Sequence, residues 1–289
     1  VMSISLFSRL GNVNLDKHLA YVKQVPDEFM LGEDPYIGKS KREIADGLKH
    51  WMDYPLVTGH YTAVKAAQAK GFTVNVNATI FDGHSAEDIA KYLDFAQSMG
   101  VGVSISPGYA YERAPDQEHF LNREKTKNLF RDIFRQGNGG KKWEFTQSEL
   151  FLDFLAGNQT YECSPWSMPC RTVFGWQKPC YLLGEGYAKT FKELMDGTDW
   201  DQYGVGNYEK CANCMVHCGF EGTAATDAIK HPLKMLPILM RGVKTEGDFA
   251  PEIDLSKQRP AEYVFSRHVE KKMSEIRAGK SNTTEADVQ

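Results

Sequence analysis

The sequence of 289 residues lacks several features that mark broad classes of protein. It has no run of about 18 apolar residues, so no membrane-spanning segment is predicted. Residues 3–22 lack the continuous apolar stretch of a secretory signal. The net charge of −4 argues against a nucleic-acid-binding protein, and no G-x-G-x-x-G nucleotide loop is present. These absences predict a globular protein of the cytoplasm.

Cysteine is missing from most of the chain, because all six cysteines fall between Cys163 and Cys218. Thiols that only fill a core need not cluster in the sequence, whereas thiols that share a metal must converge in space. Without a secretory signal we expect reduced thiols, which favours metal ligation over disulfide bonds. Free structural thiols are the second interpretation. The window therefore predicts a metal or iron–sulfur site.

Two strands and an intervening helix are predicted in the first half of the chain. Residues 72–80 alternate between apolar and polar side chains, which is typical of a strand. An apolar stripe over residues 89–99 predicts a helix, and residues 101–106 alternate again. A strand, a helix and a strand with short connections indicate a βαβ unit and a parallel sheet. The predicted fold class is therefore α/β.

One face of each predicted strand is polar, although strands of parallel sheets are usually apolar on both faces. Two interpretations stay open: an antiparallel or edge sheet with one face in water, or a parallel barrel or half-barrel whose lumen holds a polar ligand. In a barrel, ligands gather at the carboxyl ends of the strands. The polar side chains that would face such a ligand are Asn75, Asn77, Ser104 and Ser106.

The second half of the chain is organised differently. Helices are predicted at residues 122–135 and 148–156, on either side of the flexible sequence Gly-Asn-Gly-Gly at 137–140. Residues 158–222 are rich in Gly, Pro and aromatics, so loops held by ligands are expected there. Residues 224–244 predict a helix broken by proline. The predicted organisation is a divergent N-terminal segment (1–48), a partial barrel (49–145), a cysteine-bearing C-terminal extension (146–270) and a disordered tail (271–289).

A C-x2-C-x3-C pattern closes the cysteine window, and earlier cysteines accompany it. Thiolates bind Zn²⁺ in four-coordinate sites and bind iron in clusters, so both metals stay open. Cys170 is predicted to be the spare thiol, because it lies inside the first loop without a partner of matching spacing. The predicted metal ligands are Cys163, Cys180, Cys211, Cys214 and Cys218.

Several runs of the sequence resemble the adenosylhopane synthase family, radical SAM proteins of hopanoid biosynthesis. The resemblance is dense and covers roughly residues 50 to 270. The runs that carry it are GFTVNVNATIFDG, SPGYAYERAPDQEHFLNREKTKNLFRDIFR, LFLDFLAGNQTYECSPW, VFGWQKPCYLLGEGYAKTFKELM, NYEKCANCMVHCGFEGTA and RPAEYVFSRHV.

This resemblance implies a partial triosephosphate-isomerase-type barrel, followed by a C-terminal cysteine-bearing extension. The cysteine spacing also resembles the half-motif of SPASM and twitch extensions, which implies an auxiliary 4Fe–4S cluster. The family cleaves S-adenosylmethionine reductively, and the resulting 5′-deoxyadenosyl radical adds to the alkene of diploptene to give adenosylhopane. The implied partners are a hopene lipid and a reductant protein. Tyr109, Glu112 and Arg113 would close the barrel mouth, and Arg113 suits a carboxylate. Any peripheral contact with the inner face of the membrane would fall on residues 232–243, where core packing is the alternative.

The sequence also departs from this family. No cysteine precedes Cys163, so the family's N-terminal C-x3-C-x2-C loop is absent, and the glycine-rich strand that binds S-adenosylmethionine is absent as well. We therefore expect this chain alone to be impaired in S-adenosylmethionine cleavage, and the sequence assigns no catalytic residue. Two alternatives are a non-catalytic, zinc-stabilised binding module and a decayed paralogue without metal.

Overall fold

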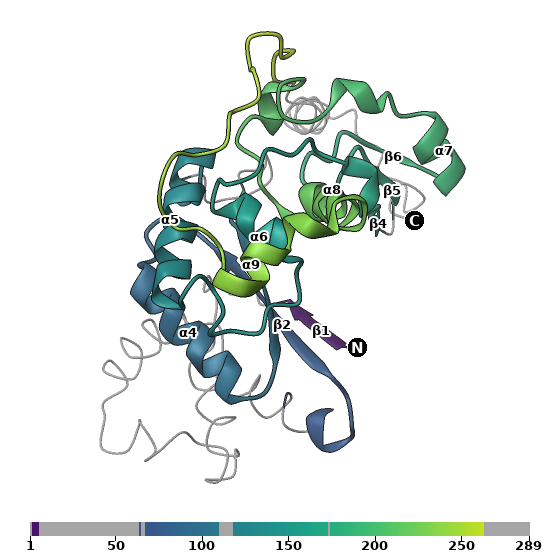
Figure 1. Ribbon diagram of the computed structural model, residues 1–289. Helices are drawn as coiled ribbons and strands as arrows, with labels where there is room; N and C mark the ends of the chain where they lie inside the picture. Colours follow the sequence, from purple (N-terminus) through teal and green to yellow (C-terminus); the bar gives the residue numbers. More distant parts are fainter. Residues whose placement is uncertain (1, 6–63, 65–66, 110–117, 173, 263–289) are drawn as a thin grey trace, which may run out of the picture. The chain divides into compact units, whose positions relative to one another are not determined.

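The computed structural model describes residues 2–5, 64, 67–109, 118–172 and 174–262 (Figure 1). These residues form a mixed α/β structure with two small three-stranded sheets. Neither sheet closes into a barrel within these ranges. The chain divides into two compact units, the first comprising Val1–Thr79, Asp88–Ile105 and Trp143–Thr146, and the second comprising Ile80–Glu87, Ser106–Lys142 and Gln147–Gln289.

A sheet in the order β1–β2–β3 forms the centre of the first unit. Strand β1 (Met2–Ser5) pairs in parallel with β2 (Val74–Ile80). Strand β3 (Gly102–Pro107) lies on the other side of β2, and helix α4 (Ala86–Ser98) connects them along the chain. The predicted strand–helix–strand order is confirmed, whereas β1 was not expected from the sequence. Three strands do not test the predicted barrel.

The alternating sequence of β2 explains its burial. Val74, Val76, Ala78 and Ile80 are buried, and the polar residues between them are half-buried. On β3, Val103 and Ile105 are likewise buried. This is the pattern of a strand that presents one apolar face to a core. The polar side chains of β2 thus lie on the face opposite the buried apolar side chains, as the alternating sequence predicted.

Helices dominate the second unit, and side-chain caps fix where two of them begin. Helix α5 (Arg123–Gln136) starts after Asn122, whose side chain accepts a hydrogen bond from the Lys125 amide at 2.8 Å. Helix α6 (Glu149–Leu155) starts after Ser148 in the same way. Such caps satisfy amide groups that the first helical turn leaves unpaired. Both helices were predicted to within two residues.

Helix α6 packs on α8 (His217–Lys230), which begins within the C-x2-C-x3-C segment. The rings of Phe154 and Phe220 stack across this contact, with centroids 4.8 Å apart. Both rings are fully buried. This aromatic core holds the start of α8 in place, and with it the last cysteine of the pattern.

Short elements fill the cysteine region, as its composition predicted. An antiparallel sheet of three short strands lies between the early and late cysteines. The strands are β4 (Arg171–Thr172), β5 (Gly175–Lys178) and β6 (Gly186–Ala188), and the short helices are η2 (Pro165–Ser167), α7 (Phe191–Asp196), η3 (Trp200–Gln202) and η4 (Glu209–Cys211). Beyond this region, η5 (Pro232–Lys234) and α9 (Leu236–Arg241) follow α8. No helix in the described ranges combines the length and apolarity needed to cross a bilayer.

Candidate metal centre

Five of the six cysteines line one cavity of about 30 Å³ in the second unit. None of the six forms a disulfide, and Cys170 is not part of the lining. The rest of the wall is mainly apolar and includes Pro165, Pro179, Leu183 and Val205. The volume exceeds that of one water-sized sphere, so the thiols surround a space. The cavity-lining cysteines are Cys163, Cys180, Cys211, Cys214 and Cys218.

Tight local structure brings the late cysteines together. Cys211 ends the turn η4, and the amide of Cys214 donates to the Cys211 carbonyl at 2.9 Å. Cys218 follows in the first turn of α8. The C-x2-C-x3-C spacing thus becomes a turn leading into a helix, which places three thiols on one wall of the cavity.

Cys163 reaches the same cavity from a distant part of the sequence. The amide of the next residue, Ser164, donates to the Gly219 carbonyl at 2.6 Å. Gly219 has no side chain, and a Cβ atom there would lie 2.6 Å from the Cys163 sulfur. The Ser167 hydroxyl also donates to the Cys218 carbonyl at 2.8 Å. These contacts fix the Cys163 loop against the start of α8.

Burial raises the pKa of all five cavity-lining thiols. That of Cys211 rises to about 12. For Cys163, the negative charges that Cys211, Cys180 and Cys218 would carry raise the pKa further. The thiols are therefore neutral near pH 7, and a bound metal cation would release their protons as it binds.

Hydrogen bonds lower the pKa of four of the five thiols and so offset part of the effect of burial. Hydrogen bonds of this kind stabilise thiolates and tune the reduction potential of iron–sulfur clusters. Three of the sulfurs receive backbone amides, and the fourth receives a phenol. The pairs are the amides of Leu182 and Leu183 with Cys180, the amide of Gly204 with Cys211, the amide of Val216 with Cys214, and the Tyr181 hydroxyl with Cys218.

The described residues contain no group of three or more His, Cys, Asp or Glu side chains arranged to hold a metal ion. A tetrahedral zinc site needs four ligand atoms about 2.0–2.3 Å from one point. The cavity-lining cysteines instead stand around a volume.

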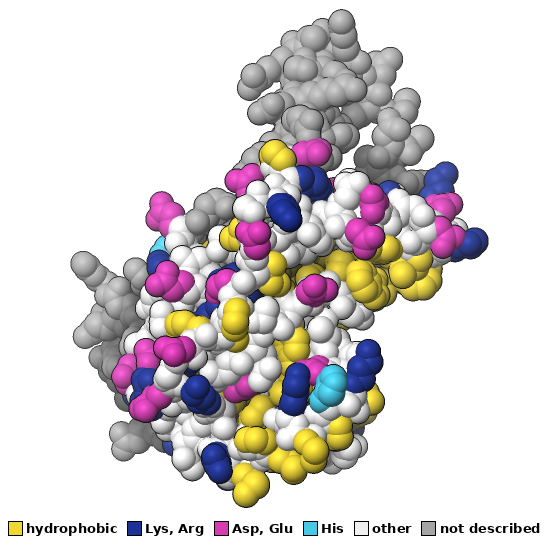
Figure 2. Space-filling model, turned by 45° about the horizontal axis from the view of Figure 1, so that its top comes forward, with side chains coloured by type: hydrophobic (Ala, Val, Ile, Leu, Met, Phe, Trp, Pro, Cys, Tyr) yellow, Lys and Arg dark blue, Asp and Glu magenta, His cyan; other side chains and the backbone are white. Residues whose placement is uncertain are grey.

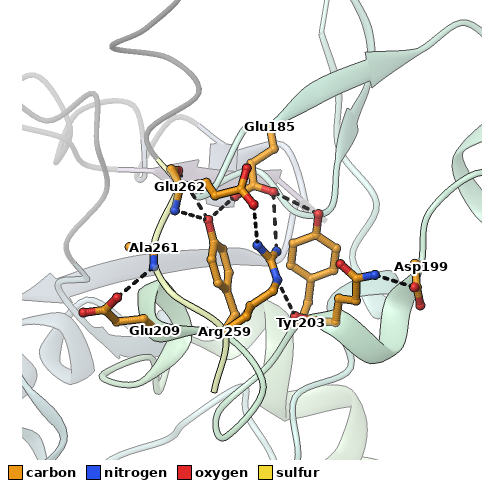
Figure 3. Close-up of polar contacts among 9 residues, drawn as sticks. Glu185, Asp199, Tyr203, Glu209, Arg259, Ala261 and Glu262 are labelled. Atoms are coloured by element: carbon orange, nitrogen blue, oxygen red, sulfur yellow. Dashed lines mark hydrogen bonds and ion pairs between the residues drawn. The ribbon is translucent and has the colours of Figure 1, made fainter. Parts of the chain in front are cut away.

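A polar network, drawn in Figure 3, includes the cavity-lining residue Tyr203. Glu185 accepts hydrogen bonds from the hydroxyls of Tyr203 at 2.9 Å and Tyr208 at 2.6 Å. The Arg259 guanidinium lies 3.5 Å from the centroid of the Tyr208 ring and forms an ion pair with Glu185 at 3.9 Å. The network therefore ties the segment around Arg259 to the cavity wall.

This network continues along residues 259–262. The Arg259 side chain also pairs with Glu262 at 3.5 Å, and Glu209 accepts from the Ala261 amide at 2.8 Å. Sequence reasoning did not find these residues as a group. Arg259 opens one of the runs that carry the family resemblance, but no periodicity or spacing linked it to Glu185.

Arg123 supports the cysteine turn from helix α5. Its guanidinium donates to the Cys214 carbonyl at 2.9 Å and to a Glu252 carboxylate oxygen at 3.2 Å. The side chain is almost fully buried, and the cost of burying its charge lowers the pKa of Arg123. The sequence gave no sign of this role, because its partners lie 91 and 129 positions further along.

The residues predicted to bind S-adenosylmethionine or substrate fall in different places. Asn75, Asn77 and Ser104 are half-buried in the first unit, where the Ser104 hydroxyl lies 2.6 Å from that of Thr146. Ser106 is buried in the second unit. Glu112 and Arg113, predicted at the same site, lie outside the described residues.

Tyr109 joins the cysteines. Its ring lines the cavity, and its hydroxyl donates to the Lys210 carbonyl, next to Cys211. Burial raises its pKa, and the neighbouring cysteines Cys214 and Cys211 add to the effect. Of the residues predicted to close a barrel mouth, this one is therefore positioned to contact whatever the cysteines bind.

Comparison with known proteins gives one family match. The model of a domain of unknown function (DUF3463) matches residues 103–238. This stretch includes all six cysteines, Arg123 and Tyr109, and it excludes Arg259. No curated protein and no solved structure matches the chain.

Proposed function

We propose that the chain is an iron–sulfur protein whose cavity-lining cysteines hold a 4Fe–4S cluster of the auxiliary type. The observation that supports this most is that five thiols from distant parts of the sequence line one cavity. A cluster presents several iron atoms, each of which takes its own thiolate, so its ligands stand apart around a volume. Four thiols suffice, and the fifth is available as an alternative ligand.

The donor set and its surroundings fit such a group. Thiolates are the usual ligands of iron–sulfur clusters, and hydrogen bonds to the sulfurs together with low solvent exposure set the potential. Here four sulfurs have donors, and proline, leucine and valine side chains form much of the wall. When bound, a cluster supplies one-electron chemistry. The chain's own residues exclude water, orient the ligands and, through Tyr109, offer a phenol at the wall.

We further propose, from the sequence resemblance, that the chain belongs to the radical SAM chemistry of hopanoid biosynthesis. Its partners would then be S-adenosylmethionine, a diploptene-like hopene and a reductant protein. The family's catalytic cluster requires three cysteines before the barrel strands, and no cysteine precedes Cys163. These 289 residues are therefore expected to carry the auxiliary cluster without cleaving S-adenosylmethionine.

Metal analysis tests the cluster proposal. The chain is purified anaerobically, reconstituted with iron and sulfide, and assayed for iron, sulfide, zinc and visible absorption. We expect iron and sulfide in equal amounts, at about four of each per chain. Zinc at one per chain without sulfide would overturn the proposal in favour of a zinc-stabilised module. Absence of any metal would favour a decayed paralogue.

A matched pair of variants locates the ligands. Cys211→Ser removes a thiol from the cavity, whereas Cys170→Ser removes one outside it. We expect Cys170→Ser to keep the full iron and sulfide content. Cys211→Ser should lose most of it or change the visible and electron paramagnetic resonance spectra. Equal iron loss in both variants would contradict the assignment.

The reaction has a separate test. Reduced, reconstituted protein is incubated with S-adenosylmethionine, and 5′-deoxyadenosine is quantified. We expect none above the background of protein-free controls. Robust cleavage would show that this chain houses a catalytic cluster, which would refute the assignment of the cavity-lining cysteines to an auxiliary role.

A further inference from the structure

An exposed apolar surface lies on the second unit, away from the residues that line the cysteine cavity. It is formed by the end of α8, the turn η5 and helix α9, and we call it the α8–α9 ridge. Each of its five residues exposes between 48% and 81% of its surface. Figure 2 shows exposed hydrophobic side chains beside Lys and Arg on one face of the molecule. The ridge residues are Ile229, Leu233, Leu236, Leu239 and Met240.

Helix geometry places these side chains on one side of α9. Leu236, Leu239 and Met240 are spaced i, i+3 and i+4, so they share a helix face. Ile238, on the opposite side, is buried. Helix α9 is therefore apolar on both sides, with one side packed inward through Ile238 and the other exposed. The sequence also allowed residues 232–243 to pack into the core. Of these residues, only Ile238 and Val243 are buried.

The stretch that includes the ridge has an excess of basic residues, which Asp227 offsets in part. Residues 228–245 contain four Lys or Arg and no Asp or Glu, in a chain whose net charge is −4. The acid just before this stretch, Asp227, is engaged by Lys234 at 2.9 Å, His231 at 2.7 Å and the Tyr161 hydroxyl at 2.8 Å. The basic residues of the stretch are Lys230, Lys234, Arg241 and Lys244.

We propose that the α8–α9 ridge is the docking surface of the protein for an anionic lipid bilayer. An amphipathic segment with aliphatic residues on one side and Lys or Arg beside them lies in the bilayer interface, apolar side chains inward. Basic residues then meet anionic headgroups. The segment is too short to span the bilayer, so it would lie on the surface.

The charge distribution distinguishes a bilayer from a second copy of the chain. A symmetric contact between two ridges would bring the basic stretches of both copies together, with repulsion between like charges. Protein interfaces are enriched in aromatic residues and depleted of Lys at their cores. The ridge consists of four aliphatic residues and Met240, without an aromatic residue, and two lysines lie in the same stretch, residues 229–240. Both features favour a lipid surface.

Vesicle flotation of the full chain tests the proposal. Vesicles of phosphatidylcholine alone are compared with phosphatidylcholine–phosphatidylglycerol vesicles, at low and at high salt. We expect binding to the anionic vesicles at low salt, weakened by high salt. The double substitution Leu233→Ser/Met240→Ser should weaken binding at least tenfold, because it removes two exposed apolar side chains. Lys230→Ala should weaken it roughly fivefold.

Phe174→Ser is the matched control, because it removes an exposed aromatic side chain from the β4–β5 turn. It should leave vesicle binding unchanged. The proposal is overturned if the full chain ignores anionic vesicles at low salt, or if the ridge variants bind as well as the parent. It is also overturned if sedimentation velocity shows a dimer that the ridge variants lose, since a second copy then covers the surface.

Vesicle binding by the ridge is expected to be independent of whether the cysteines hold a cluster. Cys211 is not part of the ridge, so Cys211→Ser protein that lacks metal should bind the same vesicles with unchanged affinity. Thermal unfolding followed by circular dichroism verifies that each variant is folded. Loss of binding on cysteine substitution alone would instead tie the surface to metal occupancy and contradict the ridge as the determinant.

Discussion

Gly219 offers a sharp test of how the cavity is built, because its missing side chain makes room for a thiol. A Cβ atom at this position would lie 2.6 Å from the sulfur of Cys163, well inside van der Waals contact. Its backbone does not have a positive φ, so alanine is otherwise suited to this first turn of α8. Gly219→Ala should therefore displace the Cys163 sulfur or the start of the helix.

The expected magnitude combines two opposing effects. Overpacking of this kind costs about 1–3 kcal/mol. Alanine stabilises a helix by about 0.5–1 kcal/mol relative to glycine. We therefore expect Gly219→Ala to lower the free energy of unfolding by up to about 2 kcal/mol. In a Cys163→Ala background the sulfur is gone, so the same change should stabilise the protein by about 0.5–1 kcal/mol.

Urea denaturation of the four metal-free proteins under reducing conditions measures this coupling, which should be about 1–3 kcal/mol. Gly222→Ala is the control, because its Cβ atom would meet Ser167 at 2.9 Å instead of a thiol. It should show no coupling to Cys163. After reconstitution, Gly219→Ala should contain less iron and sulfide than Gly222→Ala. Additive free energies, or full iron content in Gly219→Ala, would refute the reasoning.

Three further predictions concern charged side chains of the second unit. Arg123→Met leaves the Cys214 carbonyl without its donor, so the free energy of unfolding in urea should fall by about 1–3 kcal/mol. Burial raises the pKa of the Asp227 carboxyl, but hydrogen bonds outweigh this effect and lower the pKa from 3.8 to about 2. The ionised carboxyl therefore stabilises the fold above about pH 4. Asp227→Asn should cost up to about 2 kcal/mol at pH 7, and the difference should vanish as the pH falls from about 4 to 2 in denaturation series. Arg259→Lys loses the planar stacking on Tyr208 and should cost about 1 kcal/mol in thermal unfolding, whereas an unchanged midpoint would contradict that contact.

Local sequence patterns predicted the regular elements well. The alternation in residues 72–80 became β2, and Asn122 and Ser148 became the caps of α5 and α6. These features are encoded within a few residues, so the sequence alone contains them. Strand β1 was missed, because four residues do not establish a period. The predicted barrel stays a prediction, since the described strands form open sheets.

For the candidate site, the sequence predicted which cysteines come together but not the residues that support them. Clustered thiols were predicted to converge, and spacing singled out Cys170, which does not line the cavity. That the other five bind a metal stays a prediction. The supports were not predictable, because each contact joins residues far apart in the sequence. Arg123 meets Cys214 across 91 positions, and Tyr109 meets Lys210 across 101. Contacts at such separations depend on how helices pack, which no local pattern specifies.

These supports bear on whether the cysteine window could be a self-contained zinc module. A small zinc module takes its folding energy from the metal and needs little beyond its ligands. Here the turn at Cys214 is held by Arg123, which precedes the window, and the network at Tyr208 is held by Arg259, which follows it. Phe154 further anchors the start of α8 from outside the window. Because the arrangement of the cysteines depends on buried contacts from both sides, the second unit as a whole forms the scaffold of the candidate site.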